Sequence, residues 1–343
     1  MNESKYLLVA RQLREAIRNG DYLGGQKLPS ENELVARTGF SRQTIRQAMA
    51  LLETEGLTER IRGSGTYVKS IRTRKAPTHN IAVVTTYISE YIFPSILQGI
   101  SQCLQQNGYT PLLSATQNRV DTERRVLMEL MEKPIDGLIV EGTKTAIPNP
   151  NIDLYEQLER SGLPVVFVNG YYPDLRRPAF VVMDDRAGGR MAAQSLLQKG
   201  HRHIAGFFKS DDIQGHRRYQ GYAEALVRAG YSVEDDHVLW YTTENRDFLL
   251  RTSARSILQD CTAAVCYNDE TAIMAIAACE GLPCDWVSFD FSAYARMPHA
   301  PFVSLVNPKE ALGRQAAQML LDMLSGQAGS SLVLPWDAPC GGL

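Results

Sequence analysis

From residue 80 onward, short apolar runs alternate with amphipathic stretches. The runs are rich in β-branched and aromatic residues, which predicts buried strands, and the stretches repeat apolar residues every three or four positions, which predicts helices. Strands that are apolar throughout and separated by helices indicate a parallel sheet covered on both faces. Since the strands are too numerous for one such sheet, we expect a doubly wound α/β body of two similar lobes, with the chain crossing between them. The predicted strands cover 81–87, 109–116, 135–142, 164–170, 180–185, 203–210, 237–243 and 263–269, and the helices cover 94–107, 121–132, 151–161, 186–199, 214–229, 246–259 and 270–280.

The first seventy residues have a different pattern. Amphipathic spacing predicts three helices, of which the second and third begin at the capping residues Ser30 and Ser41. Ser30 and Glu33 have the spacing of a capping box. Helix, helix, turn, helix and hairpin are the elements of a winged helix-turn-helix, whose third helix enters the major groove of DNA. The helices are expected over 6–17, 31–37 and 42–55, and the hairpin over 57–68.

The third predicted helix carries Arg42 and Arg46 one turn apart, with Ile45 and Met49 on its apolar side. Arginine can donate to guanine or to phosphate with matched geometry. Two arginines at this spacing are also common on solvated helices, so the pair by itself does not establish DNA binding.

The charge of the 343 residues is unevenly distributed. Residues 1–75 hold 14 of the 36 Lys and Arg and 8 of the 38 Asp and Glu, a balance of +6. The remainder holds 22 basic and 30 acidic residues, a balance of −8. A basic head on an acidic body favours a polyanionic partner for the head, although domains also differ in charge by chance.

The head resembles the GntR family of bacterial transcription regulators over residues 6–68. Several short motifs occur in order at the right spacing, among them LPSE at 28–31, SRQTIR at 41–46 and GSGTYV at 63–68. The family often has arginine where this chain has asparagine at position 32. The resemblance implies operator contacts from Asn32, Ser41, Arg42, Thr44, Arg46, Arg62 and Gly63.

The segment KSIRTRKAPTHN at 69–80 contains four cations and Pro77 and has no apolar period, which is typical of an exposed tether. We therefore expect a DNA-binding domain at 1–69, a linker at 70–79 and a two-lobed effector-binding and dimerisation domain at 80–343.

Asn, Asp, Glu, Arg and aromatic residues follow the predicted strands of the body, at the carboxyl ends where α/β folds bind ligands. Together these side chains suit the hydroxyl groups and C–H faces of a polyol. Asp and Asn at strand ends are also common loop and cap residues, so each position alone decides little.

The body resembles the sensor domain of the lactose- and galactose-repressor family, which shares its fold with periplasmic sugar-binding proteins. Its motifs include DGLI at 136–139, PVVFVN at 164–169, RYQGY at 218–222 and NPKE at 307–310. A GntR-type head on such a body resembles the arabinose-responsive repressors of Gram-positive bacteria. By motif position, the resemblance implies effector contacts from Tyr87, Phe93, Glu141, Asn169, Arg218, Asn268 and Asp290.

Two segments depart from the family pattern. The family has glycine before a Phe-Asp pair and a second acid after it, where this chain has Ser288-Phe289-Asp290-Phe291. The C-terminal LVLPWDAPCGGL, residues 332–343, lacks the expected final strand with its arginine.

Other classes of protein fit the sequence less well. The cysteine pairs at 261/266 and 279/284 lie in surroundings typical of strand and helix-end core, so we expect buried thiols rather than a metal site. Apolar runs long enough for a membrane span and a secretory leader are missing, which favours a cytoplasmic protein. Nucleophile-elbow, P-loop and HExxH motifs are missing too, so we expect neither catalysis nor a cofactor.

We therefore expect a repressor of carbohydrate-utilisation genes that binds operator DNA and is released by a monosaccharide, with an arabinose-like pentose favoured. A homodimer is expected because one winged helix contacts few bases, whereas a two-fold dimer matches a palindrome. Two alternatives remain, namely a GntR-type regulator that senses a nucleoside or a phosphorylated sugar, and an enzyme with the same α/β fold.

Overall fold

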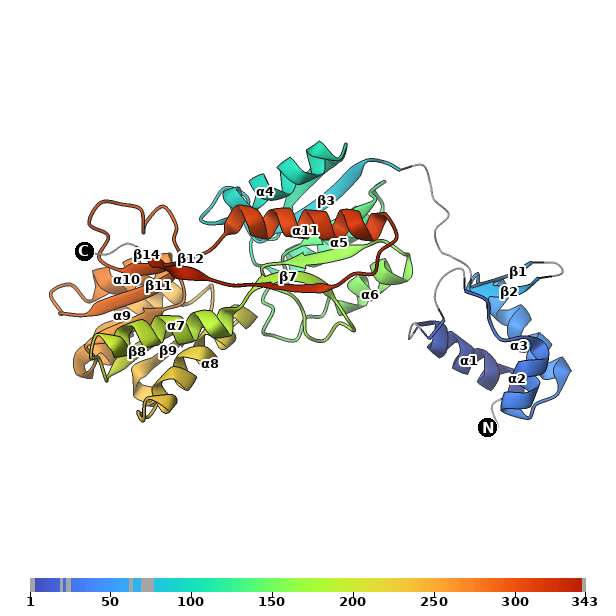
Figure 1. Cartoon of the computed structure of the whole chain (residues 1–343), viewed down its shortest axis with the longest axis horizontal. Coiled ribbons are helices and arrows are strands. Elements are labelled where there is room, and N and C mark those ends of the chain that lie inside the picture. The colour runs from blue at the N-terminus through green and yellow to red at the C-terminus, as the bar shows by residue number, and fades with distance from the viewer. Residues whose placement is uncertain (1–3, 19–20, 23–25, 62–63, 69–76, 341–343) are drawn as a thin grey trace. The chain divides into compact units, whose positions relative to one another are not determined.

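The computed structural model describes residues 4–340 apart from 19–20, 23–25, 62–63 and 69–76. The chain forms two compact units, one ending at Pro77 and the other beginning at Thr78 (Figure 1). Arg62, Gly63 and most of the predicted linker lie outside the described residues.

The smaller unit has the predicted winged helix-turn-helix elements. At the start of its second helix, the Ser30 hydroxyl accepts from the Glu33 amide at 3.3 Å, and the Glu33 carboxylate accepts from the Ser30 amide at 2.7 Å, which confirms the capping box. Ile45 and Leu52 of the third helix are buried in the core of this unit. The elements are α1 (Lys5–Arg18), α2 (Glu31–Thr38), α3 (Arg42–Thr54), β1 (Thr58–Ile61) and β2 (Gly65–Val68).

The larger unit contains two six-stranded sheets, each the centre of one lobe. In lobe 1 all strands are parallel, in the order β13-β7-β6-β5-β3-β4. Its elements are β3 (Asn80–Thr85), α4 (Phe93–Gln106), β4 (Thr110–Ala115), α5 (Val120–Met131), β5 (Gly137–Val140), α6 (Ile152–Arg160), β6 (Val165–Val168), β7 (Ala179–Met183), α11 (Lys309–Leu324) and β13 (Ser331–Leu334).

In lobe 2 the order is β14-β12-β11-β10-β8-β9, and only β14 runs antiparallel to its neighbour. A short 3-10 turn at 235–237 precedes β9, and another at 258–260 follows α9. Its elements are α7 (Asp185–Gln198), β8 (Ile204–Lys209), α8 (Ile213–Arg228), β9 (Val238–Tyr241), α9 (Arg246–Ile257), β10 (Ala263–Cys266), α10 (Asp269–Ala278), β11 (Asp285–Asp290), β12 (Val303–Val306) and β14 (Asp337–Cys340).

The chain crosses between the lobes three times, after β7, after β12 and after β13, which confirms the predicted two-lobed fold.

The prediction that the C-terminal end lacks a final strand is wrong. Residues 337–340 form β14, which pairs with the edge of β12 through Ser304–Cys340 and Val306–Asp337. The two prolines near this end hid the strand from sequence analysis, because proline is tolerated only at edges such as this one.

Close helix contacts hold each lobe together. In lobe 2, α7 and α8 cross at two glycines, where a Cβ on Gly189 would lie 2.0 Å from the Arg218 backbone oxygen and one on Gly221 would lie 1.9 Å from that of Arg186. Only glycine permits so short a distance between helix backbones. The crossing therefore determines where the side chains of α8 lie in the lobe.

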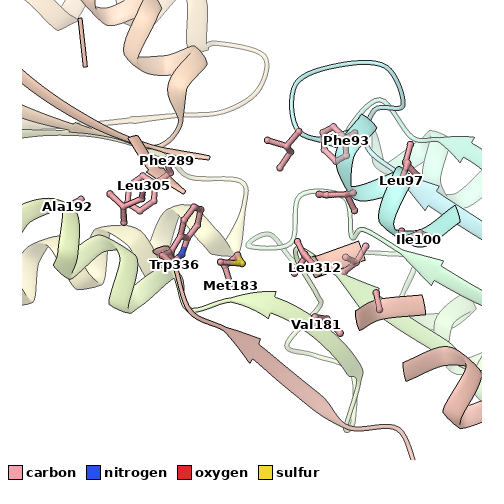
Figure 2. Close-up of a cluster of buried hydrophobic side chains, with 14 of the residues drawn as sticks. Phe93, Leu97, Ile100, Val181, Met183, Ala192, Phe289, Leu305, Leu312 and Trp336 are labelled. Carbon is pink, nitrogen blue, oxygen red and sulfur yellow. The ribbon is translucent and has the colours of Figure 1, made fainter. Parts of the chain in front are cut away.

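Apolar side chains of both lobes form one buried cluster around the crossings. Figure 2 shows Phe93 and Leu312 of lobe 1, Phe289 of lobe 2, and Trp336 from the third crossing in this cluster. A second apolar cluster belongs to lobe 2 alone and includes the cysteines at 261, 266 and 279, which are buried as predicted. Burial raises the pKa of these thiols and of the half-buried Cys284, so that they remain protonated.

Candidate functional site

The start of α3 is built from two residues that were predicted to contact DNA. The Ser41 hydroxyl accepts from the Thr44 amide at 3.2 Å and lies 2.9 Å from the Thr44 hydroxyl. This bond satisfies an amide of the first turn. The two hydroxyls therefore lie together at the helix end whose dipole favours an anion such as a phosphate.

The predicted arginines of α3 lie on its exposed side and contact α2. Arg42 donates to the Asn32 side-chain oxygen, and Arg46 donates to the Glu31 carboxylate at 2.9 Å. Arg60 of the hairpin lies 3.6 Å from the same carboxylate. Asn32 and Glu31 of α2 thus each hold one guanidinium group of α3. Sequence analysis did not single out Glu31, although it lies within the LPSE motif.

The larger unit has a pocket of about 160 Å³ between its lobes, at the carboxyl ends of the strands. All seven residues predicted to contact an effector line this pocket. Those of lobe 1 are Tyr87, Phe93, Glu141 and Asn169, and those of lobe 2 are Arg218, Asn268 and Asp290.

Glu141 and Asn169 lie side by side in the lobe 1 wall. The Glu141 carboxylate accepts from the Asn169 amide at 2.6 Å and from the backbone and hydroxyl of Thr86 at 3.0 and 2.6 Å. Burial raises the pKa of Glu141, and these hydrogen bonds oppose the rise. The group is therefore a fixed hydrogen-bond acceptor in the wall of the pocket.

Asp290 joins the two lobes at the back of the pocket. Its carboxylate accepts from the Tyr91 hydroxyl of lobe 1 at 2.7 Å and from the Asn307 amide at 3.2 Å. Its backbone has φ 94°, followed by φ 44° at Phe291, and the Lys309 ammonium holds the Asp290 carbonyl. The segment 288–291, which departs from the family motif, thus ends in a strained turn. The contacts of Asp290 with Tyr91, Asn307 and Lys309 stabilise this turn.

The serine that replaces the family's glycine has its own partner. Ser288 is buried and donates to Asp269, whose carboxylate also accepts from the Ser304 hydroxyl at 2.6 Å and the Ser292 amide at 2.7 Å. This network fixes the first turn of α10 against β11. The neighbouring cap residue Asn268 uses its side-chain oxygen to accept from the Thr271 amide at 2.9 Å, which leaves its amide nitrogen for the pocket.

Arg218 is buried and held on all sides. Its Nε donates to Asp185 at 2.8 Å, and its Nη1 donates to the Tyr267 carbonyl. Burial lowers the pKa of Arg218, but the charges of Asp185 and Asp290 outweigh this and raise it overall. Burial also raises the pKa of Asp185 to about 6, in spite of the nearby guanidinium. Sequence analysis placed Asp185 at a strand end but did not pair it with Arg218.

The other cations of the pocket, which sequence analysis did not select, are paired with carboxylates. The Lys209 ammonium lies 2.6 Å from Asp212, and Arg246 lies 3.1 Å from Glu270. Lys209 ends β8 and Arg246 follows β9, so the strand-end rule could have found both. The pocket is lined by three cations and by five carboxylates, which are Glu90, Glu141, Asp212, Glu270 and Asp290.

Hydrogen bonds also join the lobes beside the pocket. The Asn118 amide donates to the Thr243 hydroxyl at 2.6 Å, and the Ile213 amide donates to the Thr145 hydroxyl at 3.0 Å. Lys144 and Glu244 form an ion pair between the lobes. The pocket therefore lies beside polar contacts between two lobes that the chain joins at three crossings.

Two family models match the chain. Residues 5–68 match the bacterial regulatory proteins of the gntR family, and residues 78–283 match the periplasmic binding proteins and sugar binding domain of the LacI family. Among the described residues, none of the helices is both long and apolar enough to cross a membrane.

Similar proteins cover nearly the whole chain. An arabinose metabolism transcriptional repressor of Halalkalibacterium halodurans is 36% identical over 337 residues, 94% of this chain and 90% of that protein. Another of Geobacillus stearothermophilus is 38% identical over 332 residues, 93% and 91% of the two chains. A solved structure of a transcriptional regulator CelR–cellobiose complex has a TM-score of 0.68 at 22% identity, covering 90% of this chain and 98% of that one.

The winged helix, the two-lobed fold and these matches define a transcription regulator that joins a GntR-type DNA-binding head to a LacI-type sugar-binding domain. Within that class, the chain belongs to the family of the arabinose metabolism transcriptional repressors. The predicted fold class and the predicted family are both confirmed.

Proposed function

We propose that the protein represses carbohydrate-utilisation genes and is released from its operator by a small, uncharged sugar, with an arabinose-like pentose favoured. The observation that carries this proposal is the charge pattern of the pocket. Each of its three cations is already paired with a carboxylate, and further carboxylates line the walls. A phosphorylated sugar would bring negative charge to this environment, whereas hydroxyl groups can both donate and accept there.

The size of the pocket supports a ligand of one sugar ring. Its volume of about 160 Å³ is below the roughly 300–1,000 Å³ usual for drug-sized ligands. Tyr87 and Phe93, whose ring centroids are 5.9 Å apart, offer apolar faces to C–H groups. The names of the two similar repressors make arabinose the first sugar to test.

On the DNA side, we propose that Ser41, Arg42, Thr44 and Arg46 contact the operator together with Asn32. We also propose contacts from Arg62 and Gly63, which lie outside the described residues. Arg42 and Arg46 are exposed side chains of a helix whose opposite side is buried. We place the DNA-binding domain at 1–69, the linker at 70–79 and the effector-binding domain at 80–343.

We propose that the protein acts as a homodimer in the bacterial cytoplasm, where operator DNA lies, and has no enzymatic role. A two-fold dimer presents two recognition helices to a palindrome. Sugar binding would change the relation between the lobes and thereby the spacing of the two heads. The required coupling is about 1–3 kcal/mol, the free energy by which sugar favours the state that does not fit DNA.

The test is an operator shift assay on the full-length protein, with DNA selected by that protein from a random pool. We expect arabinose to release the complex, and a phosphorylated pentose to have no effect. Release by a nucleoside but by no sugar would contradict the proposed sugar effector. It would still support a transcription regulator, one that senses a nucleoside.

Reciprocal variants separate the two sites in the same assay. Arg42→Ala should lose specific DNA binding and keep sugar binding in calorimetry, whereas Arg218→Ala should bind DNA and fail to respond to sugar. If either variant lost both activities, the assignment of its arginine to one site would be wrong or the variant would be misfolded, and a melting curve separates these outcomes.

A further inference from the structure

The third crossing between the lobes places a tryptophan at the junction. Pro335 and Trp336 are the residues between β13 of lobe 1 and β14 of lobe 2. The Trp336 ring is 4% exposed and packs edge-on against Phe289, with centroids 5.2 Å apart. Figure 2 shows it beside Phe289 of lobe 2 and Met183 of lobe 1. The ring therefore lies where any change in the angle between the lobes acts on it.

The same ring contacts the arginine of the proposed sugar site. The Arg218 guanidinium carbon lies 4.9 Å from the Trp336 centroid, 4.5 Å from that of Phe289 and 4.8 Å from that of Tyr267. Three aromatic rings and the Asp185 carboxylate thus enclose this cation. Cations are attracted to aromatic faces at such distances, and tryptophan attracts them most strongly.

Two features indicate that the indole does more than fill space. Its Nε1 is buried without a hydrogen-bond partner among the described residues, a cost that phenylalanine or leucine would avoid. The fold also makes room for the ring at Gly188, where a Cβ would lie 2.7 Å from the Trp336 Cδ1. Gly188 is one turn after Asp185 on α7, so the same helix accommodates the indole and pairs with the arginine.

We infer that Trp336 is a positioning residue for Arg218, and that it links the position of this arginine to the angle between the lobes. The inference rests on the proposed role of Arg218 in binding sugar. It assigns a function to the C-terminal crossing, the segment in which this sequence departs from its family pattern.

The test compares sugar binding by full-length variants in calorimetry, with arabinose as the probe. Loss of a cation–aromatic contact corresponds to a Kd increase of about two- to thirty-fold, which we expect for Trp336→Leu. Trp336→Phe keeps an aromatic face and should bind within about three-fold of the wild type.

The matched control is Trp286→Leu. Trp286 is 6% exposed and stacks on Phe207 at 6.1 Å in the cluster that belongs to lobe 2 alone. This variant should lose stability as Trp336→Leu does, yet keep the wild-type Kd for arabinose. Operator binding without sugar should be unchanged in both variants, which shows that they are folded.

A second measurement follows Trp336 itself. The chain has three tryptophans, so replacing Trp240 and Trp286 by phenylalanine leaves Trp336 as the sole reporter. Its emission should change on addition of arabinose, with a midpoint equal to the calorimetric Kd.

Each outcome bears on one proposal or on both. A wild-type Kd in Trp336→Leu, or unchanged emission while calorimetry detects binding, would overturn the inference and leave the proposed function intact. If the wild-type protein neither bound a sugar nor was released by one, the proposed function would fail, and the inference would fall with it.

Discussion

Gly189 on α7 provides a direct test of how the fold positions the proposed sugar site. A Cβ added there would lie 2.0 Å from the Arg218 backbone oxygen, whereas ordinary contact begins at 3.4 Å. In Gly189→Ala, α7 and α8 must therefore separate by about 1.4 Å, the difference between these distances. This movement displaces Arg218 from Asp185, with which it forms a 2.8 Å hydrogen bond.

The expected effects follow from that displacement. Overpacking costs about 1–3 kcal/mol, and the better helix propensity of alanine offsets about 1 kcal/mol of it. The free energy of unfolding should therefore fall by up to about 2 kcal/mol, which lowers Tm by at most about 4–8 °C in a unit of this size. A lost hydrogen bond from a charged group is worth about 1.5–3 kcal/mol, so the Kd for arabinose should rise at least about ten-fold.

Calorimetric titration and a melting curve on the full-length variant measure both effects. Gly230→Ala is the matched control, since Gly230 has φ 85° and a Cβ there would meet nothing within 4 Å. It should lose about 1–2 kcal/mol through backbone strain and keep its sugar affinity. An unchanged Kd in Gly189→Ala would show that the close crossing of α7 and α8 does not position the arginine.

Two further predictions concern buried carboxylates. Because burial raises the pKa of Asp185 to about 6, its charge and its hold on Arg218 are present above that pH and lost below it. Arabinose affinity in calorimetry should therefore fall from about pH 7 to about pH 5, and Asp185→Asn should be weak at both; equal pH dependence in the variant would point to another group. Glu123, fully buried in lobe 1, accepts hydrogen bonds from five donors, so Glu123→Ala should lose about 3–5 kcal/mol in urea unfolding. The exposed Glu129→Ala on the same helix should change stability by less than about 0.5 kcal/mol, and a similar value for both would refute the assignment of Glu123 as a buried hub.

The candidate site was largely accessible from sequence because two rules operate on it together. Parallel strands bring their carboxyl ends to one edge, so residues as far apart as Tyr87 and Asp290 could be assigned to one pocket before any distance was known. Motif resemblance then selected among the polar residues at those ends. Neither rule concerns contacts between the lobes, and for this reason the bond from Tyr91 to Asp290 and the role of Trp336 were missed.

The sequence by itself determined the local features of the chain and its periodic pattern of apolar residues. Caps such as Ser30 and Ser41, apolar spacing and strand runs depend on neighbours within a few residues, and they defined both the winged helix and the α/β body. Contacts over tens or hundreds of residues were decided only by tertiary structure, since they depend on how finished elements pack. The pairing of Arg218 with Asp185 requires the glycine crossing of α7 and α8, and its contact with Trp336 requires β14 to find the free edge of β12.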